Sequence, residues 1–197
     1  MADRPWWQAT TIYQVYPRSF ADSNGDGIGD LPGLIDRLGH LVDLGVGTLW
    51  VSPFFVSPQA DFGYDIADYC DVDPSYGTLA DAERLVEECH RRGLRVLFDL
   101  VMNHTSDQPP WFVESRRDRT NPRADWYLWH DGGGPTKRPN NWRAALEVRS
   151  AWQWGEERQQ WFLATFLPWQ PDLNWHNPEV REAMFGVVRF WLDRGVD

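Results

Sequence analysis

One apolar run of this chain carries polar residues of the kind that do chemistry. Residues 94–104 are rich in Val and Leu, yet they contain Asp99 and end in His104. Such a run is typical of a strand buried on both faces of a parallel sheet. A carboxylate is costly to bury unless partners surround it. Asp99 and His104 are therefore either ligand-facing groups at a strand end or satisfied structural groups, and both interpretations stay open here.

A second candidate lies in the loop that follows the apolar run 48–51. In a βα fold, a loop at the carboxyl end of a strand lies on the ligand face. Tyr64 offers a ring for stacking and Asp61 a charged acceptor for hydroxyl groups. A surface loop whose aromatic residues pack locally is the alternative.

Residues 22–30 carry oxygen ligands at alternate positions, as in the first nine positions of an EF-hand calcium loop. The twelfth-position Glu is absent, because Gly33 stands there. We expect a structural Ca²⁺ site, with Mg²⁺ as the less suited ion and an ion-free polar turn as the alternative. The expected ligands are Asp22, Asn24, Asp26, the carbonyl of Ile28, and Asp30.

These residues need elements to position them, and the spacing of apolar residues supplies the pattern. Strands are expected at 11–16, 48–51 and 94–104. Helical spacing between them predicts two helices, on Leu34, Leu38, Leu41 and Val42 and on Ala82, Leu85, Val86 and Cys89. Strands that alternate with helices predict an α/β fold with a parallel sheet and right-handed crossovers.

The third helix comes late in the chain. Residues 104–172 show little helical or strand periodicity and much Pro, Gly, Asn and Trp, so we expect an inserted subdomain there. Asn177 and Pro178 then begin a helix that Gly195 ends, with Val180, Met184, Val187, Val188 and Trp191 as its buried face.

Composition excludes some partners. The formal charge of −10 argues against nucleic acid and anionic membrane surfaces. There is no stretch long enough to cross a bilayer and no signal-peptide core, and the two cysteines, Cys70 and Cys89, lack metal-type spacing. We therefore expect a reduced, cytoplasmic protein, and the sequence leaves its oligomeric state open. The 13 Trp residues are an excess that favours a carbohydrate ligand, because Trp stacks on sugar rings.

Five motifs in order resemble the α-amylase superfamily of retaining glycoside hydrolases, and within it the α-glucosidase and oligo-1,6-glucosidase branch. They cover residues 12–20, 22–30, 63–68, 99–104 and 170–175. The resemblance implies the N-terminal part of a TIM (β/α)8 barrel, its first three βα units, with a B subdomain inserted after strand 3. The expected division is 1–103 for the first part of the barrel, 104–172 for the B subdomain, and 173–197 for the third helix and the start of strand 4.

The same resemblance implies a pocket for a non-reducing-end glucose. Its expected substrate-binding residues are Asp61, Tyr64, Asp99, His104, Phe166 and Gln170. Retaining hydrolysis needs two carboxylates about 5–5.5 Å apart. In the family these follow the fourth and fifth strands, so no residue of this chain is expected to be catalytic. Asp197 matches the first Asp of the nucleophile motif and not the nucleophile itself, and the isolated chain is expected to be inactive and poorly soluble or partly unfolded.

The parent function that the resemblance implies is an exo-acting retaining α-glucosidase that takes glucose from maltose-like or isomalto-oligosaccharides. A trehalose synthase-like or other α-glucosyl transferase is one alternative. A non-catalytic barrel that serves as a binding or transporter-partner subunit is another, disfavoured by the retained pocket residues. Two stretches depart from the family pattern: Pro109 replaces a His, and residues 141–152, near the pocket rim in the family, lack the usual Phe-Gly-Gly turn.

Overall fold

The computed structural model describes residues 4–197, which form two compact units. The first unit comprises the chain up to residue 56 together with 70–100 and 188–197, and the second comprises 57–69 and 101–187. Each unit is described by itself below. The division into 1–103, 104–172 and 173–197 expected from the sequence stays a prediction.

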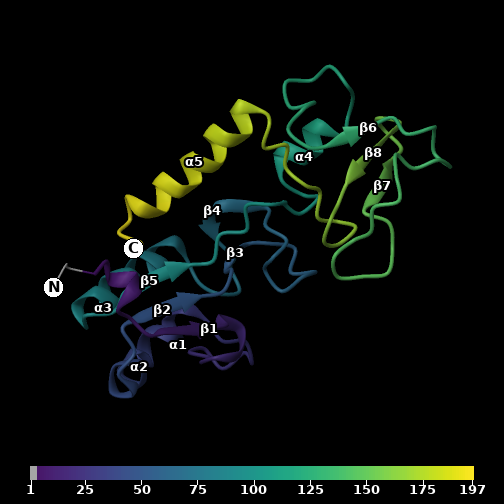
Figure 1. The fold of residues 1–197 in the computed structure, drawn as a ribbon. Helices are drawn as coiled ribbons and strands as arrows, with labels where there is room; N and C mark the ends of the chain where they lie inside the picture. The colour runs from purple at the N-terminus through teal and green to yellow at the C-terminus, as the bar shows by residue number, and fades with distance from the viewer. Residues whose placement is uncertain (1–3) are drawn as a thin grey trace. The chain divides into compact units, whose positions relative to one another are not determined.

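A three-stranded parallel sheet forms the centre of the first unit, in the order β1-β2-β5 (Figure 1). Its strands are β1 (Ile12–Val15), β2 (Thr48–Val51) and β5 (Arg95–Phe98). Thr48 of β2 is in register with Ile12 on one side and with Arg95 on the other. Helices lie between consecutive strands in the chain, which confirms the predicted alternation and the parallel pairing.

The first predicted helix is two helices in the structure. Helix α1 (Leu31–Asp36) and helix α2 (Leu38–Leu44) meet at Arg37, whose φ of −102° and ψ of 3° interrupt the helix. Leu34, Leu38 and Leu41 are fully buried, but Val42 is 41% exposed and does not belong to the buried face. Gly45 ends α2 at a φ of 79°, a left-handed conformation that favours glycine.

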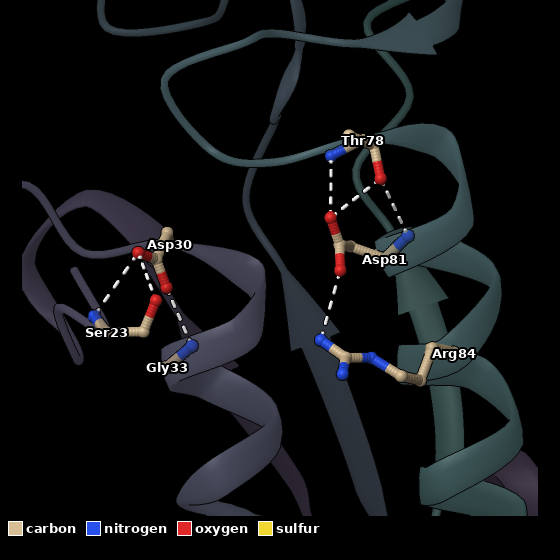
Figure 2. A network of polar contacts seen from close by, with 6 residues as sticks. All are labelled: Ser23, Asp30, Gly33, Thr78, Asp81 and Arg84. Carbon is tan, nitrogen blue, oxygen red and sulfur yellow. Dashed lines mark hydrogen bonds and ion pairs between the residues drawn. The ribbon is translucent and has the colours of Figure 1, made fainter.

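Helix α3 (Leu79–Arg91) buries Ala82, Leu85, Val86 and Cys89, as its spacing predicts. A capping box begins it. The hydroxyl of Thr78 accepts from the Asp81 N–H at 3.2 Å, and the Asp81 carboxylate accepts from the Thr78 N–H at 2.9 Å (Figure 2). These reciprocal bonds satisfy backbone N–H groups of the first turn and mark the first residue of the helix.

The run 94–104 contains a shorter strand than its apolar character predicts. Strand β5 ends at Phe98, and residues 99–104 are irregular apart from a single bridge at His104. The prediction of a strand over the whole run is therefore wrong. Asp99 comes directly after the strand, and its N–H continues the ladder by donating to the Val51 carbonyl at 3.0 Å.

Four aromatic residues pack together in the first unit. The ring centroid of Phe54 lies 4.7 Å from that of Phe98 and 4.9 Å from that of Phe55, and Trp191 lies 5.3 Å from both Phe55 and Phe98. Phe55 belongs to the short strand β3 (Phe55–Val56), which pairs with β4 (Asp68–Val72). This cluster packs Trp191 against the last residue of β5 and the residues that follow β2.

The second unit contains a small antiparallel sheet, drawn in green in Figure 1, in the order β6-β8-β7. Its strands are β6 (Trp129–His130), β7 (Trp152–Gly155) and β8 (Gln160–Leu163), and helix α4 (Pro110–Ser115) precedes them. Residues 104–172 thus hold more regular structure than their weak periodicity predicts. Strands of two to four residues are too short to give a period.

A buried guanidinium group holds this sheet to the segment before it. Arg158 is only 6% exposed. Its Nη1 donates to the carbonyls of Ser115 and Ala124, both at 2.7 Å, and its Nε donates to Gln160 at 2.6 Å. The group also lies 4.5 Å from the centroid of the Trp129 ring. Carbonyl oxygens and an aromatic face therefore replace the water that the charge gives up on burial.

Helix α5 (Pro178–Leu192) begins where the sequence places it. Asn177 accepts from the Glu179 N–H at 2.8 Å, which is the expected N-cap. Val180, Met184, Val187 and Trp191 are buried, and Val188 is half-buried. No helix between residues 4 and 197 has the length and apolar character that a bilayer crossing requires.

Candidate functional site

A fully buried carboxylate folds the loop that carries Asp61 and Tyr64. Asp65 accepts from the hydroxyl of Ser57 at 2.8 Å and from the N–H groups of Ala60 and Asp61 at 3.0 and 3.1 Å. Three donors to one carboxylate compensate for its burial and close the loop on itself. The Tyr64 N–H then donates to the Asp61 carbonyl at 3.0 Å, which fixes these two residues relative to each other.

The Asp61 side chain meets a residue far along the chain. Gln170 is fully buried, and its Nε2 donates to Oδ2 of Asp61 at 2.8 Å. The Gln170 Oε1 is itself held by the N–H of Leu167 at 3.0 Å, so the amide is fixed at both ends. Burial raises the pKa of Asp61, the nearby Asp65 charge raises it further, and the bond from Gln170 opposes both. Asp61 is half-buried, so it keeps surface on which to accept hydrogen bonds from a ligand.

Antiparallel pairing places His104 beside the segment that contains Gln170. His104 bridges to Asp172. The N–H of Leu173 donates to the Asn103 carbonyl at 3.0 Å, and that of Thr105 donates to Pro171 at 3.2 Å. Two stretches more than sixty residues apart in the sequence are thus held in register by backbone bonds.

The environment of His104 favours the neutral imidazole. Its side chain is 4% exposed, and burial lowers its pKa from 6.5 to about 4. Its Nε2 lies 3.2 Å from the carbonyl oxygen of Tyr64, which can only accept, so Nε2 carries the proton. Nδ1 then accepts from the Asn103 amide at 3.3 Å. The ring of Phe166 covers it, with centroids 4.9 Å apart and planes at 48°.

Five of the six expected substrate-binding residues therefore form one connected set in the second unit. Asp61 contacts Gln170 and Tyr64, Tyr64 contacts His104, and His104 contacts Phe166. Asp99 lies in the first unit, directly after β5. Nothing in these contacts tests whether a sugar binds, so the binding roles stay predictions.

Three residues that hold this set were not predicted from the sequence. Asp65 organises the loop, as described above. The Asn103 amide also donates to Oδ1 of Asp172 at 3.2 Å. The hydroxyl of Tyr69 lies 2.8 Å from the His104 carbonyl and 3.0 Å from that of Val101. Asp65 and Asn103 belong to motifs already quoted and Tyr69 directly follows one, so a signal existed, but the partners of Asn103 and Tyr69 are remote in the sequence.

Asp172 and Asn174 serve as anchors in this structure. Oδ1 of Asp172 accepts from the N–H of Thr165 at 3.1 Å and from its hydroxyl at 3.0 Å, while burial raises the pKa of Asp172. The amide of Asn174 donates to the Asp125 carbonyl at 2.8 Å. Both side chains hold the end of the inserted segment.

The loop 22–30 has the backbone pattern of a cation loop. Asp22 accepts from the N–H groups of Gly25 and Gly27 at 2.7 and 2.8 Å, Asn24 from Asp26 at 2.9 Å, and Asp26 from Ile28 at 2.7 Å. The bonds from Gly27 and Gly25 lower the pKa of Asp22, which keeps the carboxylate ionised. These bonds direct the side-chain oxygens of Asp22, Asn24 and Asp26 toward the inside of the loop. Oxygen atoms in this arrangement suit a hard cation.

Asp30 fits the metal set less well. Its Oδ1 caps helix α1 by accepting from the Gly33 N–H at 2.7 Å, and its Oδ2 accepts from the Ser23 hydroxyl at 2.7 Å (Figure 2). Asp30 is 4% exposed. Among residues 4–197 no three His, Cys, Asp or Glu side chains converge on one point, so a cation here would depend on the Asn24 amide and the Ile28 carbonyl as well.

Asp197 is held in a structural ion pair. Its carboxylate contacts Arg95 and lies 2.8 Å from Nε2 of His90, and it accepts from the Val96 N–H at 2.9 Å. Burial acts to raise its pKa, but these three bonds outweigh burial and lower it. That Asp197 is not the nucleophile stays a prediction.

The connected set has the chemistry of a hydroxyl-binding pocket. Asp61 supplies a charged acceptor, Gln170 fixes its orientation, and Tyr64 and Phe166 supply aromatic surface. His104 is buried and neutral, which suits a hydrogen-bonding group better than an acid. None of these contacts brings two carboxylates together in the way that glycoside cleavage requires.

Comparison with known proteins gives one consistent answer. Residues 14–197 match the family described as alpha amylase, catalytic domain. A probable alpha-glucosidase of Rhizobium meliloti is 57% identical over 195 residues, and an oligo-1,6-glucosidase of Parageobacillus thermoglucosidasius is 49% identical over 195 residues. Each match covers 99% of this chain, and 35% and 34% of the respective relative, so the chain spans about a third of their length.

A solved structure gives the same picture. The crystal structure of an alpha-glucosyl transfer enzyme superposes with a TM-score of 0.96 at 56% identity, over 99% of this chain and 36% of that one. The likeness at this level covers the sheet, the inserted segment and the loops that carry the candidate site.

Proposed function

The chain belongs to the alpha-amylase catalytic-domain family, a partial (β/α)8 barrel here, and from this premise we propose that it supplies the glucose-binding part of an exo-acting retaining α-glucosidase. The proposed substrates are maltose-like or isomalto-oligosaccharides with a terminal α-linked glucose. The observation that carries the proposal is the connected set of Asp61, Tyr64, His104, Phe166 and Gln170.

Each residue of the set has a proposed task. The ring of Tyr64 stacks on the glucose ring, and Asp61 accepts from two sugar hydroxyls, held in place by Gln170. His104 contacts a further hydroxyl, and Phe166 closes the apolar side. A sugar-binding role for Asp99 stays a prediction. Such contacts assist catalysis only if they strengthen as the sugar ring flattens toward an oxocarbenium-like transition state, which carboxylate–hydroxyl bonds near developing positive charge do.

We assign no bond-breaking role to a residue of this chain. The chemistry of the family needs a nucleophilic carboxylate and an acid/base carboxylate about 5–5.5 Å apart. Asp61 and Asp65 are close to each other, but the three donors of Asp65 and its full burial make it a structural group. Asp61 faces the amide of Gln170 instead of a second reactive carboxylate.

Direct binding tests the glucose-holding role. Titration of the chain with glucose and maltose, followed by calorimetry, should give saturable binding that Asp61→Asn weakens about tenfold, because a hydrogen bond to a charged group contributes roughly 1.5–3 kcal/mol. Asp125→Asn is the matched control, since it removes the same charge from an exposed position of the same unit. Equal weakening by both variants, or none by Asp61→Asn, would contradict the assignment.

A second candidate function is glucosyl transfer, because a protein 56% identical to this chain is described as an alpha-glucosyl transfer enzyme. Hydrolysis and transfer differ in the acceptor that receives the glucose, and both begin with the same bound sugar. The test uses a longer protein that contains this chain together with the two catalytic carboxylates, incubated with maltose and a competing alcohol. Chromatography of the products distinguishes the two reactions. Free glucose as the main product supports the hydrolase, and a glucosylated alcohol supports the transferase.

We also propose a structural Ca²⁺ in the loop 22–30, with Mg²⁺ as the weaker ion. The ligands would be Asp22, Asn24, Asp26 and the Ile28 carbonyl, with Asp30 shared between the ion and its helix-capping bond. The ion would hold the loop that begins helix α1. Adding Ca²⁺ should raise the melting temperature of the protein, and Asp22→Ala should abolish that rise. A melting temperature that is the same with Ca²⁺ and with a chelator would exclude the site.

A further inference from the structure

A cavity of about 370 Å³ lies in the second unit, formed by residues 138–150. It belongs to the inserted segment, and the function proposed above does not use it. Its walls carry three arginines, one tryptophan, two asparagines, a valine and a serine. In a chain with a formal charge of −10, three guanidinium groups around one cavity reverse the local sign of charge.

Two of the arginines have no acidic partner. Neither Arg138 nor Arg143 forms an ion pair with any residue in the range 4–197 that the structure describes. Arg138 lies 5.9 Å from the centroid of the Trp161 ring, a cation–π contact that holds the group without using its N–H donors. The two guanidinium groups thus keep planar sets of donors that match a carboxylate or a phosphate.

The third arginine is part of the wall. Arg149 contacts Glu147, and it donates to the carbonyls of Ser150 and Phe166 at 3.0 and 2.9 Å. Its bonds are therefore committed to the protein. Because Phe166 covers His104, Arg149 also connects the cavity wall to the candidate sugar site of the same unit.

An exposed tryptophan completes the cavity. The ring of Trp142 is 57% exposed although it is large and apolar. It is held parallel to Trp152, with centroids 6.3 Å apart and planes at 18°. Asn140 joins the two residues, since its Oδ1 accepts from the backbone N–H of Trp142 at 3.0 Å and from Nε1 of the Trp152 ring at 2.8 Å. A ring that is positioned yet exposed provides a surface on which a flat ligand can stack.

From these observations we propose that the cavity binds a small organic anion that carries both a ring and a phosphate or carboxylate group. Arg138 and Arg143 hold the anionic group, and Trp142 stacks on the ring. The ring and the charge must be present together, because the arginines are partly solvated and a bare anion would gain little from them. The site does not depend on the function proposed above, since its ligand is not the terminal glucose.

Calorimetric titration with three probes tests the proposal. Phenyl phosphate carries an aromatic ring, glucose 6-phosphate carries a sugar ring, and inorganic phosphate carries none. At 0.15 M salt at least one ring-bearing probe should bind about tenfold more tightly than inorganic phosphate, and comparison of the two identifies the kind of ring. Equal affinity for all three probes, or no saturable binding, would overturn the proposal.

Variants then locate the binding. Arg143→Ala and Arg138→Ala should each weaken the preferred probe about fivefold to tenfold. Arg117→Ala is the matched control, because Arg117 is exposed in the same unit and lies outside the cavity. Trp142→Leu should remove the preference for a ring and leave inorganic phosphate unaffected. If Arg117→Ala weakens binding as much as Arg143→Ala, the effect is one of net charge and the proposal fails.

Glucose binding separates this site from the candidate sugar site. Arg143→Ala should leave the affinity for glucose unchanged, whereas Asp61→Asn should leave the affinity for the anionic probe unchanged. Loss of both affinities in one variant, accompanied by a changed near-ultraviolet circular dichroism spectrum, indicates a folding defect. In that case affinity for the anionic probe is measured with Arg143→Gln, which keeps a polar side chain but removes the charge. Wild-type affinity for the probe in this variant would also overturn the proposal.

Discussion

The protonation of His104 should make the protein less stable as the pH falls toward 5. The ring is 4% exposed, and burial lowers its pKa from 6.5 to about 4. Between these two values the unfolded chain binds a proton at His104 and the folded chain does not. Because the unfolded state then binds more protons, the free energy of unfolding rises with pH across this window and is lost as the pH falls through it.

The magnitude follows from the difference between the two pKa values. A difference of about 2.5 units, at roughly 1.4 kcal/mol per unit, corresponds to about 3 kcal/mol over the whole window. Between pH 7.0 and 5.5 alone, linkage gives a loss of about 1 kcal/mol. The measurement is most practical in this narrower range.

His104→Gln isolates the contribution of this one group. Glutamine keeps an N–H donor that can reach the Tyr64 carbonyl but does not titrate. The comparison is needed because burial raises the pKa values of Asp61 and Asp172, and raised carboxyl pKa values make stability change in the opposite direction with pH. Urea unfolding at pH 7.0 and 5.5 should show the wild type losing about 1 kcal/mol more than the variant.

The exposed His176 supplies the control, since His176→Gln should leave the pH dependence of the wild type intact. Nuclear magnetic resonance titration of the His104 ring provides an independent measurement that needs no unfolding. A His104 ring that titrates near pH 6.5, or identical losses of stability in the wild type and His104→Gln, would show that the ring is solvated in the folded protein and that this reasoning is wrong.

Changes at four further positions have predicted effects on the free energy of unfolding, each measurable by urea denaturation. Arg158→Met should cost about 3 kcal/mol, because it removes a charged donor from the buried carbonyls of Ser115 and Ala124, and Arg158→Lys should not restore the loss. Thr78→Ala should cost about 1 kcal/mol by removing the cap of helix α3, and an unchanged stability would mean that the capping bonds are replaced by water. Gly33→Ala should destabilise although alanine favours helices, because its Cβ would lie 2.3 Å from the Ala21 carbonyl oxygen. A Cβ at Gly39 would meet no atom within 4 Å, so Gly39→Ala should stabilise the protein by about 0.5–1 kcal/mol. If the two glycine substitutions changed stability in the same direction, the steric argument would be wrong.

Local patterns predicted the elements whose limits are set locally. Strand β2 has the predicted bounds because a short apolar run is enclosed by polar and turn-forming residues. Asn177 and Gly45 mark helix ends through their own conformations and side-chain bonds. The capping pair Thr78 and Asp81 is equally local, since its two members are three residues apart.

The elements that were missed depend on partners elsewhere in the chain. The apolar run 94–104 is divided because Asn103 and Thr105 pair with residues 171–173 instead of continuing strand β5. Apolar character shows that a segment is buried, but it does not show which backbone it pairs with. The hairpin of β7 and β8 left an aromatic signal at Trp152 and Trp161 but too few residues for a period.

The candidate site shows the same division. Asp61, Tyr64 and His104 could be proposed from their positions after predicted strands. Phe166 and Gln170 came only from the resemblance to the family, and their contacts with His104 and Asp61 join segments far apart in the sequence. The role of Asp65 depends on three donors in its own loop, which the sequence does not distinguish from a surface turn.

The tryptophans are unevenly divided between the two units, so the intrinsic tryptophan signal of the protein comes mainly from one of them. Nine of the 13 lie in the second unit: Trp111, Trp126, Trp129, Trp142, Trp152, Trp154, Trp161, Trp169 and Trp175. Several are close enough for their transitions to couple, such as Trp154 and Trp161, with centroids 5.3 Å apart. Fluorescence and near-ultraviolet circular dichroism therefore report mainly on the second unit. Far-ultraviolet circular dichroism samples the helices of the first unit as well, so a difference between the two unfolding curves would show that the units lose their structure separately.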